Sequence, residues 1–175
     1  MSRTLNSILN SLLIGLLFSA VCFDCPVWSQ TSTEVPAAPV PTQIASAKRA
    51  FIFNAGEETY FQLPKDAMYT GGPNRTYNQF YAAMKSWGRY ELSSTPADAD
   101  IVFEIGFSYR NQGPTFVSQI KLVVFDPKTH IGLWTFTNYV EPAGMAKNRE
   151  KNYNIAMDAL MGDLKNLVSP AAPAK

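Results

Sequence analysis

The chain has 175 residues, of which 46% are hydrophobic and 13% aromatic, and its formal net charge at pH 7 is +1. A chain so close to neutral lacks the concentrated basic face of a nucleic-acid-binding protein, and it offers no strong attraction to an anionic membrane surface. Its length suits one domain with a single core, for which the aromatic residues supply large buried areas.

The first thirty residues have the pattern of an export signal. Met1–Ser7 carries one positive charge, Arg3, and is followed by the almost wholly apolar segment Ile8–Phe23 and then by Val27-Trp28-Ser29. This is the order of regions in a secretory signal peptide, so residues 1–29 are predicted to be removed by cleavage after Ser29. The mature protein is then expected in a bacterial periplasm or outside the cell.

A retained membrane anchor is the alternative interpretation of this segment. Ile8–Phe23 is shorter than the ~20 apolar residues of a spanning helix, contains Asn10 and ends at Asp24. Cys22 and Cys25 precede the predicted cleavage site, and neither follows the small residue that lipidation requires. After cleavage the chain has no thiol, which excludes a disulfide or a thiolate metal site.

Two segments flank the predicted domain. Residues 30–47 are rich in proline and alanine, with Pro36, Pro39 and Pro41, and are predicted to form an extended, semi-rigid linker. Residues 169–175 are predicted to form a flexible tail. The folded domain is therefore expected over residues 48–168.

The first half of this domain is predicted to contain a strand and a helix. Ala50–Asn54 is a short apolar run, closed by Ala55-Gly56, which predicts a strand buried on both faces. After a loop over Glu57–Gly72, a helix is predicted from Pro73 to Trp87, with Gly88 as its stop. Its apolar face is expected to consist of Tyr77, Phe80, Tyr81, Met84 and Trp87.

The second half is predicted to be a meander of three strands. Apolar and polar residues alternate along Asp100–Arg110, Thr115–Phe125 and His130–Val140, as in strands with one buried face. Asn111–Pro114 joins the first two strands, and the turn Asp126–Thr129 joins the last two.

A long helix is predicted to close the chain, over Lys147–Val168, with an apolar stripe that includes Tyr153, Leu160 and Leu164. A meander with one solvated face needs helices on its other face. The predicted fold class is therefore α+β: a two-layer sandwich with a mainly antiparallel sheet of about four to five strands and two helices packed on one face.

Several segments of the chain resemble known bacterial proteins. Ala97–Glu104, Lys121–Thr129, Leu133-Trp134 and Asp163–Leu167 resemble a group of small exported bacterial proteins of unknown function. Their arrangement is also similar to that of lipoproteins built like the amino-terminal domain of TolB or the curli-secretion lipoprotein. The resemblance covers about Ala50–Val168 and implies an envelope assembly or accessory protein, mostly without catalysis. It assigns no role to individual residues.

Catalytic residues are not indicated by the sequence. His130, the only histidine, could form a Ser-His-Asp triad with Ser118 and Asp126. Ser118, however, lies within a predicted strand without a nucleophile elbow, and His130 lies beside a turn, where a polar residue needs no special explanation. We therefore predict no catalytic residue.

Three acids favour the rival interpretation, a secreted or periplasmic hydrolase. Asp98, Asp100 and Glu104 could share a cleft or bind a hard cation. The segment has no glycine-bent ligand loop with a closing glutamate, so we predict neither a metal nor a cofactor. Acids that converge in a concave pocket would favour the enzyme, and scattered acids would favour a binding protein.

The predicted binding site lies around the start of the first helix. The glycines of Thr70–Arg75 allow a sharp turn, the helix start presents amide donors, and Arg75 could contact a carboxylate or phosphate. A glycine-capped helix start with a solvated Arg75 is the structural alternative. The predicted contact residues, including loop aromatics that we expect to be exposed, are Gly71, Gly72, Asn74, Arg75, Tyr60, Phe61 and Tyr69.

Together, these patterns predict an exported, non-catalytic binding or envelope-accessory protein. Its partner is expected to be an envelope protein or a cell-wall component, and not a nucleic acid. A membrane contact is expected only if the N-terminal segment is retained, in which case the protein would be a membrane-tethered scaffold.

Overall fold

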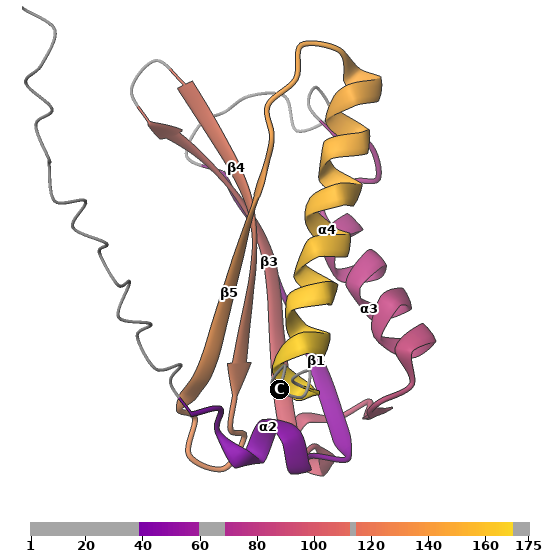
Figure 1. Ribbon diagram of the computed structural model, residues 1–175, viewed down its shortest axis with the longest axis vertical. Helices are drawn as coiled ribbons and strands as arrows, with labels where there is room; N and C mark the ends of the chain where they lie inside the picture. Colours follow the sequence, from indigo (N-terminus) through magenta and orange to yellow (C-terminus); the bar gives the residue numbers. More distant parts are fainter. Residues whose placement is uncertain (1–38, 60–68, 113–114, 170–175) are drawn as a thin grey trace, which may run out of the picture. The chain divides into compact units, whose positions relative to one another are not determined.

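A five-stranded sheet with helices on one face makes up the folded part of the chain (Figure 1). The computed structural model describes residues 39–59, 69–112 and 115–169, all within the unit Ala38–Lys175. In chain order, the elements of this part are α2 (Thr42–Ser46), β1 (Arg49–Thr59), α3 (Arg75–Trp87), β2 (Glu91–Leu92), the 3₁₀ helix η2 (Pro96–Asp98), β3 (Ile101–Gln112), β4 (Thr115–Phe125), β5 (Gly132–Val140) and α4 (Ala146–Val168).

The sheet is mixed, with the strand order β2-β1-β3-β4-β5. Strands β3, β4 and β5 form the predicted antiparallel meander, in which Ile105 lies opposite Leu122 and Leu122 opposite Phe136. Strand β1 runs parallel to both of its neighbours, because the chain crosses over through α3 before it returns as β2. The predicted α+β fold class, with two long helices on one face of the sheet, is confirmed.

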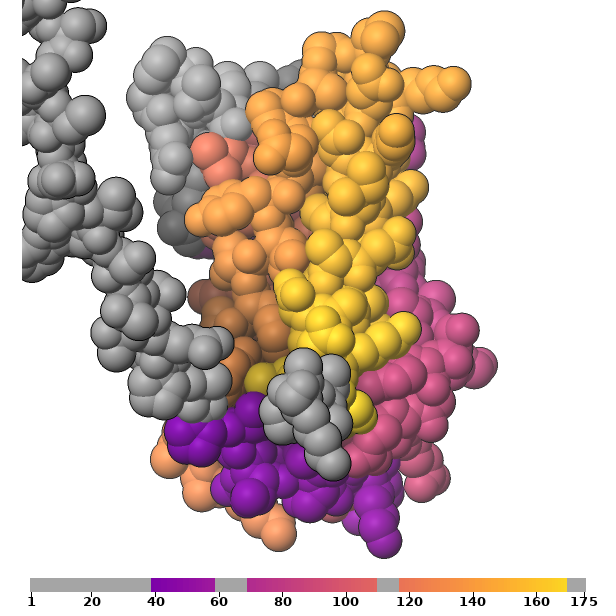
Figure 2. Space-filling view, viewed as in Figure 1, coloured from indigo at the N-terminus to yellow at the C-terminus, as the bar shows by residue number. Residues whose placement is uncertain are grey.

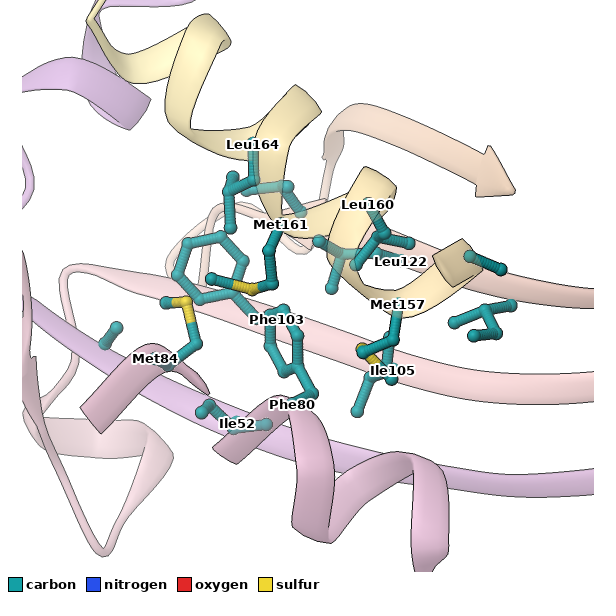
Figure 3. Packing of buried hydrophobic residues seen from close by; sticks show 14 of the residues in the cluster. Ile52, Phe80, Met84, Phe103, Ile105, Leu122, Met157, Leu160, Met161 and Leu164 are labelled. Atoms are coloured by element: carbon teal, nitrogen blue, oxygen red, sulfur yellow. The ribbon is translucent and has the colours of Figure 1, made fainter. Parts of the chain in front are cut away.

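Helices α3 and α4 cover one face of the sheet, which we call the covered face (Figures 1 and 2). Strand residues alternate between the two faces, so every second residue of the central strands points into the helical layer. In Figure 3, side chains from α3 and α4 meet those of the sheet in one layer. The sheet residues of this layer that have no exposed surface are Ala50, Ile101, Phe103, Ile105, Ile120, Leu122 and Val124.

Helix α3 ends as predicted but begins two residues later than predicted. Gly88 follows it in the left-handed conformation, with φ 65°, and its N–H donates to the carbonyl of Met84. At the other end, Pro73 lies in a turn and Asn74 is the N-cap residue. Of the predicted apolar face, Phe80 and Met84 are buried, whereas Tyr81 is 38% exposed.

Strand β1 corrects one prediction. It is longer than the predicted Ala50–Asn54, and it is not buried on both faces, since Phe51 is half-buried and Phe53 is 48% exposed. Both long helices lie on the other face of the sheet, and neither Phe51 nor Phe53 is among the described residues of the hydrophobic core cluster. The strand passes through the predicted stop with a bulge at Asn54, where Gly56 adopts φ 77°.

The packed part of the chain begins earlier than predicted. Helix α2 lies within residues 30–47, the predicted linker, and its Ile44 has no exposed surface. The Tyr90 hydroxyl donates to the carbonyl of Ile44, and the guanidinium of Arg89 donates to the carbonyls of Ala45 and Ala47. These contacts make α2 part of the domain and shorten the predicted linker.

The remaining predictions about the ends of the chain concern residues that the structure does not describe. The predicted signal peptide, residues 1–29, lies outside the described residues, as do residues 170–175 of the predicted tail. Among the helices that are described, none combines the length and the apolar character needed to cross a membrane.

Candidate functional site

The face of the sheet opposite α3 and α4, which we call the open face, carries two hollows. The register of β1, β3 and β4 arranges its residues in four rows across the strands. From one end to the other, these rows are Phe51-Val102-Phe125, Phe53-Glu104-Val123, Gly56-Gly106-Lys121 and Glu58-Ser108-Gln119. The open face thus changes from apolar at one end to polar at the other.

The apolar end forms a hollow of about 550 Å³. Its floor consists of the sheet residues Phe51, Phe53, Val102, Glu104 and Phe125, and its rim consists of Pro96, Ala97, Asp126, Pro127 and His130. None of the three phenylalanine rings is in contact with another aromatic ring of the described chain. Their faces are therefore available to an apolar or cationic group.

A second hollow of about 390 Å³ occupies the polar end, and Glu104 belongs to both. The glycine pair Gly56 and Gly106 contributes no side chains to its floor. A Cβ at Gly106 would lie 3.1 Å from the Cβ of Ala55, a tight contact, because the bulge brings Ala55 close to Gly106. The space beside Gly56 is open, since a Cβ there would meet nothing within 4 Å.

Two charged groups of the open face have no partner. Neither the carboxylate of Glu104 nor the ammonium group of Lys121 forms an ion pair or a side-chain hydrogen bond with any described residue. They lie on neighbouring strands, one row apart, since Glu104 is opposite Val123 and Lys121 is opposite Gly106. The buried hydroxyl of Ser108, in the same hollow, also has no hydrogen-bond partner among the described residues.

The β4–β5 turn forms part of the rim of the apolar hollow. The carboxylate of Asp126 accepts hydrogen bonds from the N–H of Lys128 and the hydroxyl of Thr129, both at 2.9 Å. These bonds hold the pKa of Asp126 below its ordinary value. His130, at the end of the turn, adopts φ 58°, a left-handed conformation that non-glycine residues seldom adopt. The turn is therefore fixed by its own hydrogen bonds.

The predicted anion site is occupied by a carboxylate of the chain itself. The guanidinium of Arg75 pairs with Glu150 of α4 at 2.5 Å, donates to the carbonyl of Thr70 at 2.9 Å and lies 4.0 Å from the ring centre of Tyr153. Glu150 also accepts a hydrogen bond from the N–H of Thr70 at 2.7 Å. An external anion would have to displace Glu150 before it could bind Arg75. The anion site therefore stays a prediction.

This cluster connects the segment before α3 to α4. Burial raises the pKa of Glu150, but the hydrogen bonds from Thr70 and Arg75 and the charge of Arg75 outweigh burial, so the net pKa is lowered. Gly71 and Gly72 adopt φ 103° and 69°, which confirms that the turn before the helix needs glycines. The amide of Asn54 donates to the side chain of Asn74, so Asn74 is likewise bonded within the protein.

The predicted aromatic contact residues are only partly described. Tyr69 is not an exposed loop residue as expected: its ring lies edge-on to Phe107, with the ring centres 5.5 Å apart. It also packs against Tyr153, and its hydroxyl donates to the hydroxyl oxygen of Ser118 at 3.2 Å. Tyr69 therefore belongs to the layer between sheet and helices. Tyr60 and Phe61 lie outside the described residues.

The fold does not bring together Ser118, His130 and Asp126, the three residues that could have formed a Ser-His-Asp triad. Ser118 is buried on the covered face near one end of β4, whereas Asp126 and His130 lie in the turn beyond its other end. At ~3.3 Å per residue, Ser118 and Asp126 are about 26 Å apart along the strand. No Ser-His-Asp arrangement follows from these three residues.

The three acids of the rival hydrolase also lie apart. Asp98 accepts a hydrogen bond from the hydroxyl of Thr95, and Asp100 accepts hydrogen bonds from the N–H groups of Lys48 and Arg49. The bonds to Arg49 and Lys48 hold the pKa of Asp100 below its ordinary value. Of the three, only Glu104 lines a hollow. The described residues contain no group of three acids, histidines or cysteines placed to hold a metal ion.

The main residues of the open face were not identified as a site by the sequence analysis. Phe51 and Phe53 were interpreted as core residues, because a short apolar run alone does not reveal whether one or both faces of a strand are covered. The number of predicted helices was the available signal, because two amphipathic helices can cover only one face of a sheet of this width. The apolar residues on the other face of β1 then stay uncovered by these helices.

Comparison with known proteins shows similarity of the fold alone. No protein-family model matches the chain, and no curated protein sequence does. The C-terminal domain of LpoB from Salmonella enterica is 11% identical, with a TM-score of 0.39, and the match covers 54% of this chain and 83% of that one. Uncharacterised lipoprotein B from Nitrosomonas europaea is 11% identical, with a TM-score of 0.39, and the match covers 77% and 92%.

TolB from Acinetobacter baumannii is also among the similar structures. It is 14% identical, with a TM-score of 0.37, and the match covers 70% of this chain and 28% of TolB. These structures are of the general type that the sequence indicated. At these identities and scores they show neither a family nor a role for this chain.

Proposed function

We propose that this protein is exported and acts by binding, without catalysis, through the open face of its sheet. The observation that carries the proposal is the apolar hollow over Phe51, Phe53, Val102 and Phe125. An uncovered face of a sheet is ordinarily polar, because alternation places the apolar residues toward the core. Apolar rings gathered in a hollow on such a face are typical of a site that another molecule covers.

The ionisable groups of the hollow favour binding over hydrolysis. Acid–base catalysis by two carboxyl groups needs one of them to have a raised pKa, so that it stays protonated near neutral pH. Asp126 is in the opposite situation, since the hydrogen bonds from Lys128 and Thr129 lower its pKa. It serves the turn as an ionised acceptor, which leaves Glu104 as the one free carboxylate of the apolar hollow.

The proposed setting is the bacterial periplasm or the outside of the cell, and the proposed partner is an envelope protein or a cell-wall component. Both proposals rest on the predicted export signal of residues 1–29. N-terminal sequencing of the protein from its native cells is expected to give Gln30 as the first residue. Mature protein that retains Met1 would overturn the proposed cleavage.

The binding proposal is tested by capture from intact envelopes with the tagged full chain. Phe53→Ser changes the open face, and Ile155→Ser is its matched control, because Ile155 of α4 is 54% exposed and Phe53 is 48% exposed. A reproducible partner is expected with the wild type and with Ile155→Ser, and it is expected to be lost with Phe53→Ser.

Two results would overturn the proposal. Equal capture by all three proteins would show that the open face is not the contact surface. Turnover of a cell-wall substrate that is lost in Glu104→Gln would instead support the rival interpretation of a hydrolase.

A further inference from the structure

We propose that the open face binds an extended polypeptide segment of an envelope protein, in which a basic residue lies between apolar residues and an acidic one. The inference rests on the proposed function and specifies its ligand. It follows from the dimensions of the open face, from the order of its apolar and polar rows, and from the two charges that lack partners.

The length of the open face fits an extended peptide. Successive rows are two residues apart along each strand, which corresponds to about 6.6 Å, so the four rows span about 20 Å. This is the length of six or seven extended residues. The two hollows share Glu104, so they lie next to each other along the strands, with volumes of about 550 and 390 Å³, and we call the two together the groove.

The two charges determine the order of charges in the ligand. Glu104 lies in the second row and Lys121 in the third, and neither has an ionic partner among the described residues. A basic ligand residue opposite Glu104 and an acidic one opposite Lys121, about two residues further along, would satisfy both. The register places Phe53 beside Glu104, so the same basic group can also lie over an aromatic ring.

The charges also favour a peptide over a neutral glycan. A bound sugar would take Glu104 and Lys121 out of water without giving either an opposite charge, which is unfavourable. The apolar hollow is lined mainly by phenylalanine, valine, alanine and proline, with Glu104 in its floor and Asp126 and His130 at its rim. This division suits apolar side chains at one end of an extended peptide and charged side chains in its middle.

The polar end can receive the main chain of the ligand. A Cβ added at Gly56 would meet nothing within 4 Å, so a backbone can approach the sheet closely at this glycine. The hydroxyl of Ser108 is buried and lacks a hydrogen-bond partner in the described chain. A carbonyl or N–H of the peptide would supply the bond that this hydroxyl lacks.

The test is selection from a random-peptide display library with the full chain as the target. The wild type is expected to select peptides in which a basic residue lies between apolar residues and an acidic one, in either chain direction. Glu104→Lys is expected to select peptides with an acidic residue at the basic position. For one synthetic peptide of the wild-type consensus, Glu104→Lys is expected to weaken binding at least about tenfold, as the loss of one charged hydrogen bond implies.

Lys151→Glu is the matched control for charge reversal, because Lys151 is exposed on α4, on the helical side of the molecule. It is expected to select the wild-type consensus. Far-UV circular dichroism and thermal unfolding of each variant show that the fold is kept, so that a change in selection reports on the groove itself.

The inference would be overturned if the wild type selected no consensus sequence, or if its consensus contained no charged residues. It would also be overturned if Glu104→Lys selected the same consensus as the wild type, or if purified cell-wall glycan displaced a selected peptide. A dimer that Phe53→Ser converts to a monomer would identify a second copy as the occupant and would equally overturn it. If these results occur while Phe53→Ser still loses the envelope partner, the proposed function stands and only the ligand class is wrong.

Discussion

The two faces of the sheet are built from the same strands by the same alternation, yet they differ in what covers them. On the covered face, Phe103 and Leu122 have no exposed surface, because α3 and α4 pack over them. On the open face, Phe53 is 48% exposed and lines a hollow. Neighbouring residues of one strand can therefore be changed separately, those on the covered face to affect folding stability and those on the open face to affect the proposed binding.

The charged residues of the helical side and of the open face also differ, in whether they form ion pairs. On the helical side, Arg75 and Glu150 form an ion pair, with side chains that are 10% and 26% exposed. On the open face, Glu104 and Lys121 lie one row apart and have no partner in the described chain. Charges that already pair with each other hold elements together, whereas charges without partners remain available to a ligand.

The largest expected difference between the two faces comes from phenylalanine. Phe103→Ala removes a buried ring that packs against Phe80 and Tyr90, so it is expected to lower the free energy of unfolding by about 3–5 kcal/mol. Phe53→Ala is expected to change it by less than about 1 kcal/mol. Urea unfolding followed by circular dichroism measures both. Similar losses for the two variants would mean that the open face is covered in the folded protein.

The next comparison concerns the start of the domain. Ile44 has no exposed surface, whereas Ile131 in the β4–β5 turn is 60% exposed. Ile44→Ala is expected to lower the free energy of unfolding by about 2–4 kcal/mol, and Ile131→Ala by less than about 0.5 kcal/mol. If Ile44→Ala has no effect, α2 is only loosely attached and residues 30–47 act as the linker that the sequence predicts.

The elements of the fold could be predicted from the sequence because each has a local signal. The alternation in Thr115–Phe125 gives the exact bounds of β4, and Gly88 gives the end of α3. Helix α2 was missed because five residues among prolines carry too weak a pattern, and because Ile44 is buried by residues far along the chain. Long-range burial of this kind has no signature in a short window of sequence.

The candidate site was harder to predict, for a related reason. Arg75 beside two glycines has the local pattern of an anion site, and only the folded chain brings Glu150, 75 residues further along, into contact with it. The rows of the open face likewise depend on the register between β1 and β3, which are separated by α3 and β2. The sequence shows which residues a strand contains but not which face the helices will cover.

The ion pair can be compared directly with an unpaired carboxylate. Glu150→Gln weakens the bonds to Arg75 and Thr70 and is expected to cost about 1 kcal/mol at pH 7, whereas Glu104→Gln is expected to be neutral. Because the pKa of Glu150 is lowered in the folded protein, its contribution is present above the ordinary pKa of 4.5 and is lost as the pH falls through the lower folded value.

The stability difference between the wild type and Glu150→Gln is therefore expected to shrink as the pH falls below about 4.5, which thermal unfolding across pH 3–7 can follow. The Glu104→Gln protein serves as the control for the general effect of acid. A difference that stays constant down to pH 3 would show that Arg75 and Glu150 do not interact in solution.

The last comparison concerns two buried hydroxyl groups, of which only one has a hydrogen-bond partner in the described chain. Tyr153→Phe leaves the buried Thr76 hydroxyl without its partner and is expected to cost about 1 kcal/mol, whereas Ser108→Ala removes an unpartnered hydroxyl and is expected to be neutral or slightly stabilising.

Burial raises the pKa of Tyr153 to about 12 from its ordinary value of 10.0. Between pH 10 and 12 this tyrosine ionises only in the unfolded chain, so the wild type loses stability as the pH rises through this range. The loss of stability caused by Tyr153→Phe should become smaller over the same pH range. In the folded wild type, the phenolate absorbance of Tyr153 should appear only as the pH approaches 12. If Ser108→Ala proved as destabilising as Tyr153→Phe, its hydroxyl would already be bonded within the chain and would not be available to a ligand on the open face.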